Sequence, residues 1–232
     1  MTAPPTNPRP WLPYVAPMAI FLLLTSAESW LPQPSESSPR TYYPVFYALK
    51  IAIVAIVCWL TRSTWRDLWP WPGLKTWGLA VGSGLLVTVV WVGLDGWYPV
   101  YGEVGSRVAF NPNVLSPGPK LAFLAVRMLG LVLVVPFFEE LFWRSFVVRW
   151  IIDPDHFETV PIGRVTPMAG AITAALFAFE HPAEWLPALL TGALWAWLLH
   201  VSRSVSACFI SHAVANLGLG VYVLLTGSWK FW

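Results

Sequence analysis

Residues 205–226 form the last of seven long apolar segments, and residues 205–225 contain no Asp, Glu, Lys or Arg. A helix needs about 20 mainly apolar residues to cross the hydrocarbon core of a bilayer. Six further segments precede it: residues 14–25, 44–60, 76–94, 121–138, 166–179 and 185–201. Runs this long and apolar cannot be strands of a soluble protein. The sequence therefore predicts an all-α, polytopic membrane bundle of about seven or eight transmembrane helices in a single domain.

Composition supports a membrane protein. Hydrophobic residues make up 56% of the chain, charged residues only 11%, and the mean hydropathy is +0.60. Soluble domains carry about 25% charged residues, so an ordinary soluble domain is excluded. Many of the 16 tryptophans fall near the ends of apolar segments, where aromatic rings settle at the headgroup level. The net charge of +2 is too small to indicate nucleic-acid binding, and Cys58 and Cys208 are expected to be reduced packing residues.

Residues 141–152 leave an alternative open. They are apolar but contain Arg144 and Arg149. They could continue the helix of residues 121–138, lie at the membrane interface or form part of an eighth span.

Residues 14–25 also loosely fit a signal peptide, although Pro17 interrupts the apolar stretch. The Pro- and Ser-rich stretch 31–39 is predicted to be a loop. The stretch 99–119, with clusters of Gly, Asn and Pro, is predicted to be a structured loop outside the bilayer.

The distribution of Lys and Arg predicts the orientation in the membrane, because cytoplasmic loops carry an excess of both. With the N-terminus in the cytoplasm, that side would hold Arg9, Arg62, Arg66, Lys75, Arg149, Arg164 and Arg203. The opposite side would keep Arg40, Arg107, Lys120 and Lys230. The count favours a cytoplasmic N-terminus. Seven crossings then place the C-terminus outside, whereas eight would return it to the cytoplasm.

Glu139 and Glu140 directly follow the apolar segment 121–138. An ionisable side chain inside or beside a membrane segment is costly and by default suggests function. On a helix, Glu140 and Arg144 are one turn apart and can pair, whereas Glu139 points about 100° away. A buried site beside a like charge would make Glu139 a stronger general base. The alternative is a helix end at the interface, where Glu and Arg pair without a catalytic role.

His181 follows Phe177 by four residues and closes the fifth apolar segment just before Pro182. A single His at a helix end more often forms an interfacial hydrogen bond than acts in catalysis. The neighbouring Glu180 has the same interpretation.

His212 and Asn216 lie one turn apart within the uncharged last segment. The same helix face carries Ser204, Cys208 and Gly220, so a narrow stripe of polar and small residues runs along a Leu-, Val- and Ala-rich helix. Such a stripe must face protein or water rather than lipid. Its alternative role is hydrogen bonding between helices.

Several other patterns indicate packing or solvated turns. Small residues at every fourth position, which let helices approach closely, are Ala188, Gly192 and Ala196, followed by His200. Gly82-Ser83-Gly84 is predicted to be a packing site, and the polar stretch 153–158 matches no metal-site template. The sequence has neither a His-Glu-x-x-His zinc motif nor a Gly-x-Ser-x-Gly nucleophile elbow.

Three motifs occur in order: Glu-Glu-x-x-x-Arg at Glu139, Glu140 and Arg144, Phe-x-x-x-His at Phe177 and His181, and His-x-x-x-Asn at His212 and Asn216. They resemble the signature of the CAAX-protease and bacteriocin-processing family of intramembrane endopeptidases, best known from the type II CAAX prenyl endoproteases. The resemblance covers about residues 121–225, which would be the catalytic helices. Residues 1–120 match only as membrane helices and an outer loop.

The resemblance implies a bundle of about eight helices with an active site open to the cytoplasm, in the plasma membrane of a prokaryote. The chain is also similar in style to prokaryotic CAAX-protease-related proteins that accompany exosortase-type sorting systems. The implied partners are the lipid bilayer and a membrane-associated protein or peptide, and not nucleic acid. The substrate class stays open between a prenylated C-terminal peptide, a leader peptide and a sorted protein.

The resemblance assigns the site to Glu139, Glu140, Arg144, His181, His212 and Asn216. Glu139 with His181 would activate water, His212 with Asn216 would donate to the oxyanion, and Glu140 with Arg144 would hold the first motif in place. Metal dependence stays open. Glu139, His181 and His212 could hold zinc with water as fourth ligand, or the same residues could act as a metal-free glutamate protease.

A competing hypothesis is a non-catalytic membrane scaffold or a bacteriocin-immunity-type binding protein. A transporter with a relay of Glu and His is less well supported, because the sequence shows no inverted repeats or paired broken helices.

Overall fold

The computed structural model describes residues 9–30, 42–100 and 110–231, and within these ranges the chain forms helices and no strand. The α-helices are α1 (Leu12–Ala27), α2 (Tyr43–Leu60), α3 (Leu74–Gly93), α4 (Pro117–Leu129), α5 (Val135–Glu140), α6 (Val148–Ile152), α7 (Pro167–Glu180), α8 (Trp185–Ser202) and α9 (Val205–Thr226). Two π-helical segments join α4 to α5 and α5 to α6: η4 (Gly130–Val134) and η5 (Leu141–Val147). The predicted loop 31–39 and residues 101–109 of the stretch 99–119 lie outside the described residues. In the rest of that stretch, Pro112–Val114 forms a short 3₁₀ turn and α4 already begins at Pro117.

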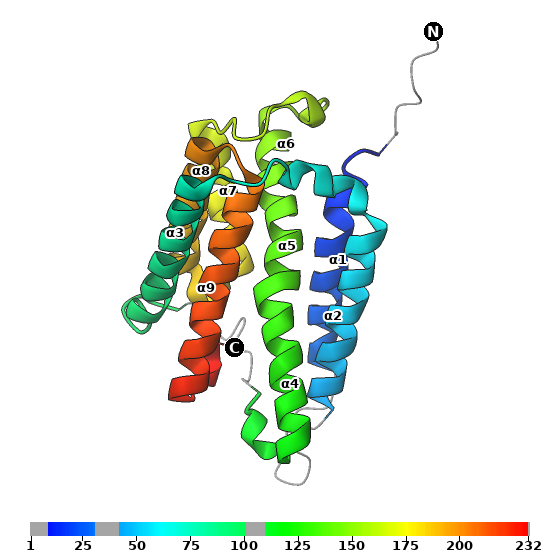
Figure 1. Cartoon of the computed structure of the whole chain (residues 1–232), viewed down its shortest axis with the longest axis vertical. Coiled ribbons are helices and arrows are strands. Elements are labelled where there is room, and N and C mark those ends of the chain that lie inside the picture. Colours follow the sequence, from blue (N-terminus) through cyan, green and yellow to red (C-terminus); the bar gives the residue numbers. More distant parts are fainter. Residues whose placement is uncertain (1–8, 31–41, 101–109, 232) are drawn as a thin grey trace.

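The polytopic helical fold is confirmed. Five helices of the described chain are long and apolar enough to span a membrane: Tyr43–Leu60, Leu74–Gly93, Pro117–Ile152, Pro182–Ser202 and Val205–Thr226. Leu12–Ala27 and Pro167–Glu180 are shorter apolar helices. These seven helices run alternately up and down between the two ends of the bundle (Figure 1). The N-terminal end of α1 and the C-terminal end of α9 therefore lie at opposite ends.

Residues 141–152 continue the helix that begins at Pro117 and add no separate span, so the whole helix Pro117–Ile152 has 36 residues. At about 1.5 Å per residue it is roughly 54 Å long, well beyond the roughly 30 Å of hydrocarbon in a bilayer. The helix is therefore longer than one crossing requires. Its two π-helical segments lie on either side of Glu139 and Glu140.

Pro136 explains the irregular backbone near η4. Proline has no N–H, so it cannot donate to a carbonyl one helical turn earlier. The chain widens into a π-helix over Gly130–Val134, and such bulges occur frequently at functional sites. The irregularity thus lies one turn before the first motif.

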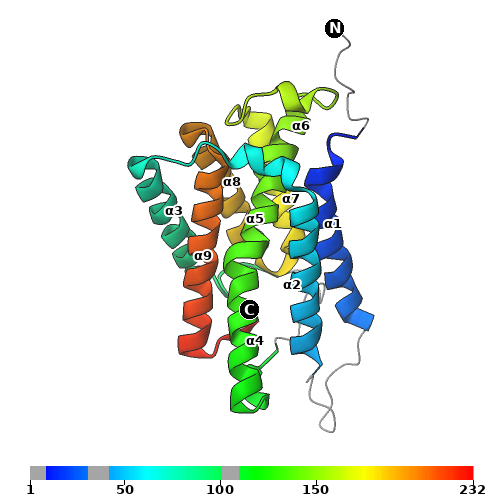
Figure 2. The same ribbon diagram turned by 45° about the vertical axis from the view of Figure 1, so that its right-hand side comes forward.

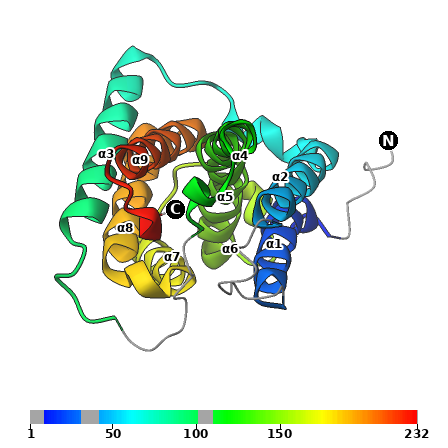
Figure 3. The same ribbon diagram turned by 90° about the horizontal axis from the view of Figure 1, so that it is seen from below.

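The long helix α4–α6 divides the bundle into two groups of helices. Seen along the bundle, α1 and α2 lie on one side of it and α3, α7, α8 and α9 on the other (Figure 3). Within the larger group, α3 packs along α9 and α7 along α8. The three motifs therefore lie on the central helix and on two helices of the larger group.

The caps of α7 and α9 set where the second and third motifs begin. Thr166 Oγ1 accepts a hydrogen bond from the Ala169 N–H at the start of α7, at 3.1 Å. Ser204 Oγ does the same for the Ala207 N–H at the start of α9, at 3.2 Å. Arg203 has a left-handed backbone (φ 56°), which reverses the chain between α8 and α9. Such caps satisfy backbone donors that have no partner within the helix.

Four arginines lie in the loops at the N-terminal end of the bundle. The connections α2–α3, α6–α7 and α8–α9 all lie at this end (Figures 1 and 2). They contain Arg62, Arg66, Arg164 and Arg203. The charges are thus gathered as the sequence predicted, and the assignment of this end to the cytoplasm stays a prediction.

Glycines let the paired helices approach closely. A Cβ atom on Gly84 of α3 would lie 2.4 Å from the Ser211 carbonyl oxygen and 2.8 Å from Val214 Cβ, both on α9. A Cβ on Gly192 of α8 would lie 2.8 Å from the Ala174 Cα of α7. The predicted packing roles of Gly84 and of the α8 stripe are confirmed.

Gly84→Ala is expected to destabilise the protein by about 1–3 kcal/mol, because the new methyl group must push α3 away from the backbone of α9. Gly82→Ala is the matched control, since a Cβ there meets nothing within 4 Å. Unfolding by SDS titration in mixed micelles measures both. Equal stability of the two variants would contradict the close contact.

Candidate active site

The first motif contains a fully buried ion pair. Arg144 Nε lies 3.3 Å from Glu140 Oε2, and both side chains are 0% exposed. The residues are one turn apart, as the sequence predicted, and η5 begins directly after Glu140. The interface alternative, in which these charges reach water, is therefore wrong for this pair.

His212 of α9 lies between the two carboxylates. Its Nδ1 is 2.9 Å from Glu140 Oε1, and its Nε2 is 3.9 Å from Glu139 Oε2. Because an ionised carboxylate can only accept, Nδ1 donates to Glu140, and Nε2 is then the nitrogen that faces Glu139. The link between Glu140 and His212 was not predicted from the sequence. It joins the first motif directly to the third.

Aromatic rings enclose this charged group. The Arg144 guanidinium carbon lies 5.5 Å from the Phe177 ring centroid and 5.4 Å from that of Trp195. The Trp195 ring also lies 4.3 Å from the His212 ring, at 31°. Desolvated cation–π contacts of this kind contribute about 2 kcal/mol. Phe177 of the second motif thus packs against Arg144 of the first. Trp195 was missed because one Trp among sixteen carries no distinctive signal.

The orientation of Trp195 is fixed by hydroxyl groups of neighbouring helices. Its Nε1–H donates to Ser211 Oγ at 2.9 Å. Ser211 Oγ also lies 2.9 Å from Ser83 Oγ of α3. The middle residue of Gly82-Ser83-Gly84 therefore has a bonding role besides packing. The predicted polar stripe of α9 faces protein, since Cys208 and His212 are buried and Asn216 bonds to the central helix.

His181 caps the C-terminal end of α7. Its Nδ1 is 2.9 Å from the Phe177 carbonyl oxygen. Since a carbonyl oxygen can only accept, Nδ1 carries the proton and Nε2 is the basic nitrogen. The His181 ring lies 4.6 Å from the Phe177 ring and 5.6 Å from the Trp91 ring, and Phe177 lies 5.7 Å from Trp195. The rings of Phe177 and Trp195 thus connect His181 to His212.

Asn216 is bound to the main chain of the central helix. Its Nδ2–H donates to the Leu131 carbonyl oxygen at 2.8 Å. Leu131 lies in η4, where Pro136 leaves carbonyl groups without a helical donor. This bond uses one of the two hydrogens of the amide. The oxyanion role of Asn216 stays a prediction, and its bond to Leu131 adds a structural role that the sequence did not indicate.

The predicted zinc ligands do not form a metal-binding group in this arrangement. Within the described ranges, no three His, Cys, Asp or Glu side chains are placed so that they could hold a metal ion. Glu139 and His212 approach each other, but His181 Nδ1 is directed to a carbonyl oxygen. The mechanism below therefore contains no step through a metal, and zinc dependence stays an open prediction. Cys58 and Cys208 are buried and free, as expected.

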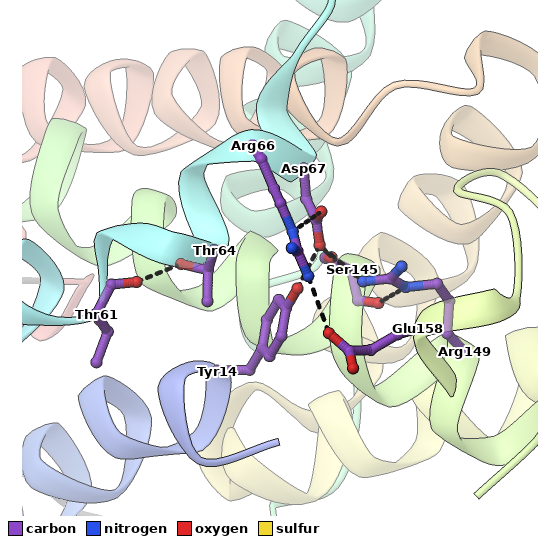
Figure 4. A network of polar contacts seen from close by, with 8 residues as sticks. All are labelled: Tyr14, Thr61, Thr64, Arg66, Asp67, Ser145, Arg149 and Glu158. Carbon is purple, nitrogen blue, oxygen red and sulfur yellow. Dashed lines mark hydrogen bonds and ion pairs between the residues drawn. The ribbon is translucent and has the colours of Figure 1, made fainter. Parts of the chain in front are cut away.

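A second buried polar cluster was missed in the sequence. It is centred on Asp67 and contains Tyr14, Ser145 and Arg149 (Figure 4). Asp67 was passed over because it stands among basic residues of a short loop, where an acid is usually solvated. The spacing of Ser145 and Arg149, four residues apart and directly after Arg144, was the available signal.

The Glu140–Arg144 pair is expected to dominate the stability of the site. Glu140→Gln leaves a buried guanidinium without its carboxylate and should cost about 3–5 kcal/mol. Lys230→Gln is the control, because Lys230 and Asp95 form an exposed pair whose loss should cost less than about 1 kcal/mol. SDS titration of the purified protein measures both. A double variant Glu140→Gln/Arg144→Met that costs as much as both single changes together would contradict the pairing.

Comparisons with known proteins identify this part of the chain. Residues 121–218 match the family model described as type II CAAX prenyl endopeptidase Rce1-like. No curated protein and no solved structure gives a significant match to the chain. The matched segment contains all three motifs and the side chains that surround His212. Over residues 121–218 the chain is therefore similar to the Rce1-like type II CAAX prenyl endopeptidase family.

Proposed function

We propose that this protein is an intramembrane endopeptidase that hydrolyses a peptide bond of a membrane-associated substrate. The observation that carries the proposal is the approach of Glu139 and Glu140 to the two nitrogens of His212. If Glu140 had only a structural role, its ion pair with Arg144 would be sufficient. A second carboxylate and an imidazole beside that pair are the groups that acid–base hydrolysis requires.

Glu139 is the proposed general base. It takes a proton from a water molecule, with the basic Nε2 of His181 as the second group that orients this water. The hydroxide oxygen attacks the carbonyl carbon of the scissile bond, and the carbonyl oxygen becomes an oxyanion. When the tetrahedral intermediate collapses, Glu139 returns the proton to the leaving nitrogen. General acid–base catalysis of this kind contributes about 10²–10⁴-fold in rate.

His212 is the proposed donor to the oxyanion, together with the second amide hydrogen of Asn216. With Nδ1–H bonded to Glu140, His212 presents Nε2 on the side of Glu139, and this nitrogen donates to the oxyanion when the imidazole takes up a proton. Fixed donors are effective in such a site because they need no reorganisation as charge develops. Glu140, which is paired with Arg144, holds the imidazole in place.

The burial of the site supports a substrate that enters from the membrane. Glu139 is 4% exposed and His212 is 4% exposed, and aromatic rings surround them. A peptide held to the bilayer by an apolar anchor would reach this depth without first crossing water. We propose that the site faces the cytoplasm, because the connections with the most positive charge lie at the end of the bundle to which α6 extends.

Glu139→Gln is expected to lower the cleavage rate by about 10²–10⁴-fold while leaving the fold intact, because glutamine keeps the shape of the side chain but cannot accept the proton. The assay uses proteoliposomes and a fluorogenic peptide that ends in a farnesylated CAAX sequence, with the same peptide lacking the farnesyl group alongside. Glu28→Gln is the control carboxylate. Full activity of Glu139→Gln would contradict the mechanism, and complementation of a deletion strain by this variant would favour a non-catalytic role.

Chelation separates the metal-free mechanism from the zinc alternative. The metal-free mechanism predicts that cleavage is unchanged after treatment with 1,10-phenanthroline and that the purified protein contains no stoichiometric zinc. Zinc coordination by Glu139, His181 and His212 would instead predict loss of activity and its recovery on adding Zn²⁺. Elemental analysis of the purified protein checks the result independently of activity.

A further inference from the structure

The Asp67 carboxylate binds three side chains from three parts of the chain. Its Oδ2 accepts hydrogen bonds from Tyr14 of α1 at 2.6 Å, from Ser145 of η5 at 2.5 Å and from Arg149 of α6 at 2.7 Å (Figure 4). Asp67 itself lies in the 3₁₀ segment Arg62–Leu68 between α2 and α3. All four side chains are buried. Asp67 therefore joins α1 and the α2–α3 connection to the central helix.

Arg149 completes this cluster on the central helix. Its Nη2 lies 2.8 Å from Ser145 Oγ, and its Nε donates to the Ser145 carbonyl oxygen. That carbonyl would otherwise depend on the backbone bonds of a π-helix, which is a rare and irregular conformation. The side chains of Asp67 and Arg149 thus stabilise the backbone of η5 at Ser145.

Ser145 and Arg144 are adjacent in sequence but contact opposite groups of helices. Ser145 is bonded to Asp67 on the side of α1. Arg144 lies against Phe177 of α7 and Trp195 of α8 and pairs with Glu140. A rotation of η5 about its axis that moved Ser145 away from Asp67 would therefore also move Arg144 relative to Glu140 and His212.

We propose that Asp67 is a positioning residue of the active site: through Ser145 and Arg149 it sets the rotation of η5 and thereby the alignment of Arg144 and Glu140 with His212. The inference rests on the proposed peptidase function. It extends the site beyond residues 121–218 and gives α1 and the α2–α3 connection a defined part in the reaction. Asp67 acts only through these residues and contacts no substrate.

The test compares Asp67→Asn with Glu28→Gln. Glu28 and Lys50 form a partly buried ion pair at 2.5 Å in the same group of helices. Both variants lose a carboxylate from an ion pair, so both should unfold at lower temperature. Only Asp67→Asn is expected to lower kcat, by about 10- to 100-fold with KM nearly unchanged, because small misplacements of catalytic groups cost rates of this order. The farnesylated CAAX peptide in proteoliposomes is the probe, at a temperature where all variants are folded.

A double variant tests the route through Arg149. If Asp67 and Arg149 act as a unit, Asp67→Asn/Arg149→Gln loses no more kcat than either single variant. Additive losses would overturn the proposed route.

Hydrogen–deuterium exchange gives a readout that does not depend on activity. Amides of residues 141–152 should exchange faster in Asp67→Asn than in the wild type and remain unchanged in Glu28→Gln. Unchanged exchange in Asp67→Asn overturns the proposal, as does a wild-type kcat for this variant or an equal loss in Glu28→Gln. Glu139→Gln assayed alongside keeps the two hypotheses apart. If Glu139→Gln is inactive and Asp67→Asn is normal, only the positioning role fails, whereas full activity of Glu139→Gln refutes the peptidase mechanism itself.

Discussion

The buried pair of Glu140 and Arg144 is the interaction on which the rest of the site depends. Two charges with no exposed surface can persist in a membrane bundle only if their partners hold them closely. Here Arg144 is held between the rings of Phe177 and Trp195, and Glu140 is held by His212. Enclosing this one pair requires contributions from α7, α8 and α9. The same contacts bring the three motifs to one place.

The irregular backbone of the central helix follows from the same requirement. Pro136 frees carbonyl groups in η4, and Asn216 occupies one of them at Leu131. Beyond Glu140 the helix widens again into η5, where Arg144 contacts one group of helices and Ser145 the other. The helix that carries the carboxylates is therefore stabilised from both sides along its upper half. An unsupported π-helix inside a membrane protein would be an unstable place for catalytic groups.

Much of the fold could be predicted, because the bilayer imposes one pattern on every span. The last apolar segment coincides with α9 (Val205–Thr226), and five of the other six agree with their helices to within a few residues. The fourth, 121–138, belongs to a helix that continues to Ile152. The continuation of the fourth segment through residues 141–152 could not be decided, because its two arginines suit an interface as well as a helix buried in protein. The alignment of Glu140 with Arg144 followed from helical spacing, whereas the bond of Glu140 to His212, 72 residues later, has no local signal.

The sequence by itself determined the membrane architecture, the order of the motifs and the residue types available for acid–base chemistry, because hydropathy and spacing are local properties. Only the tertiary structure decided which groups meet. It placed the carboxylates of Glu139 and Glu140 beside the imidazole of His212 and turned Asn216 toward the Leu131 carbonyl. It also directed His181 Nδ1 to the Phe177 carbonyl and brought Asp67 into contact with Ser145 of the central helix. Apart from the contact of His181 with Phe177, one turn earlier, these contacts join residues far apart in the chain. They depend on how the helices pack around the central one and on which buried polar groups must find partners there.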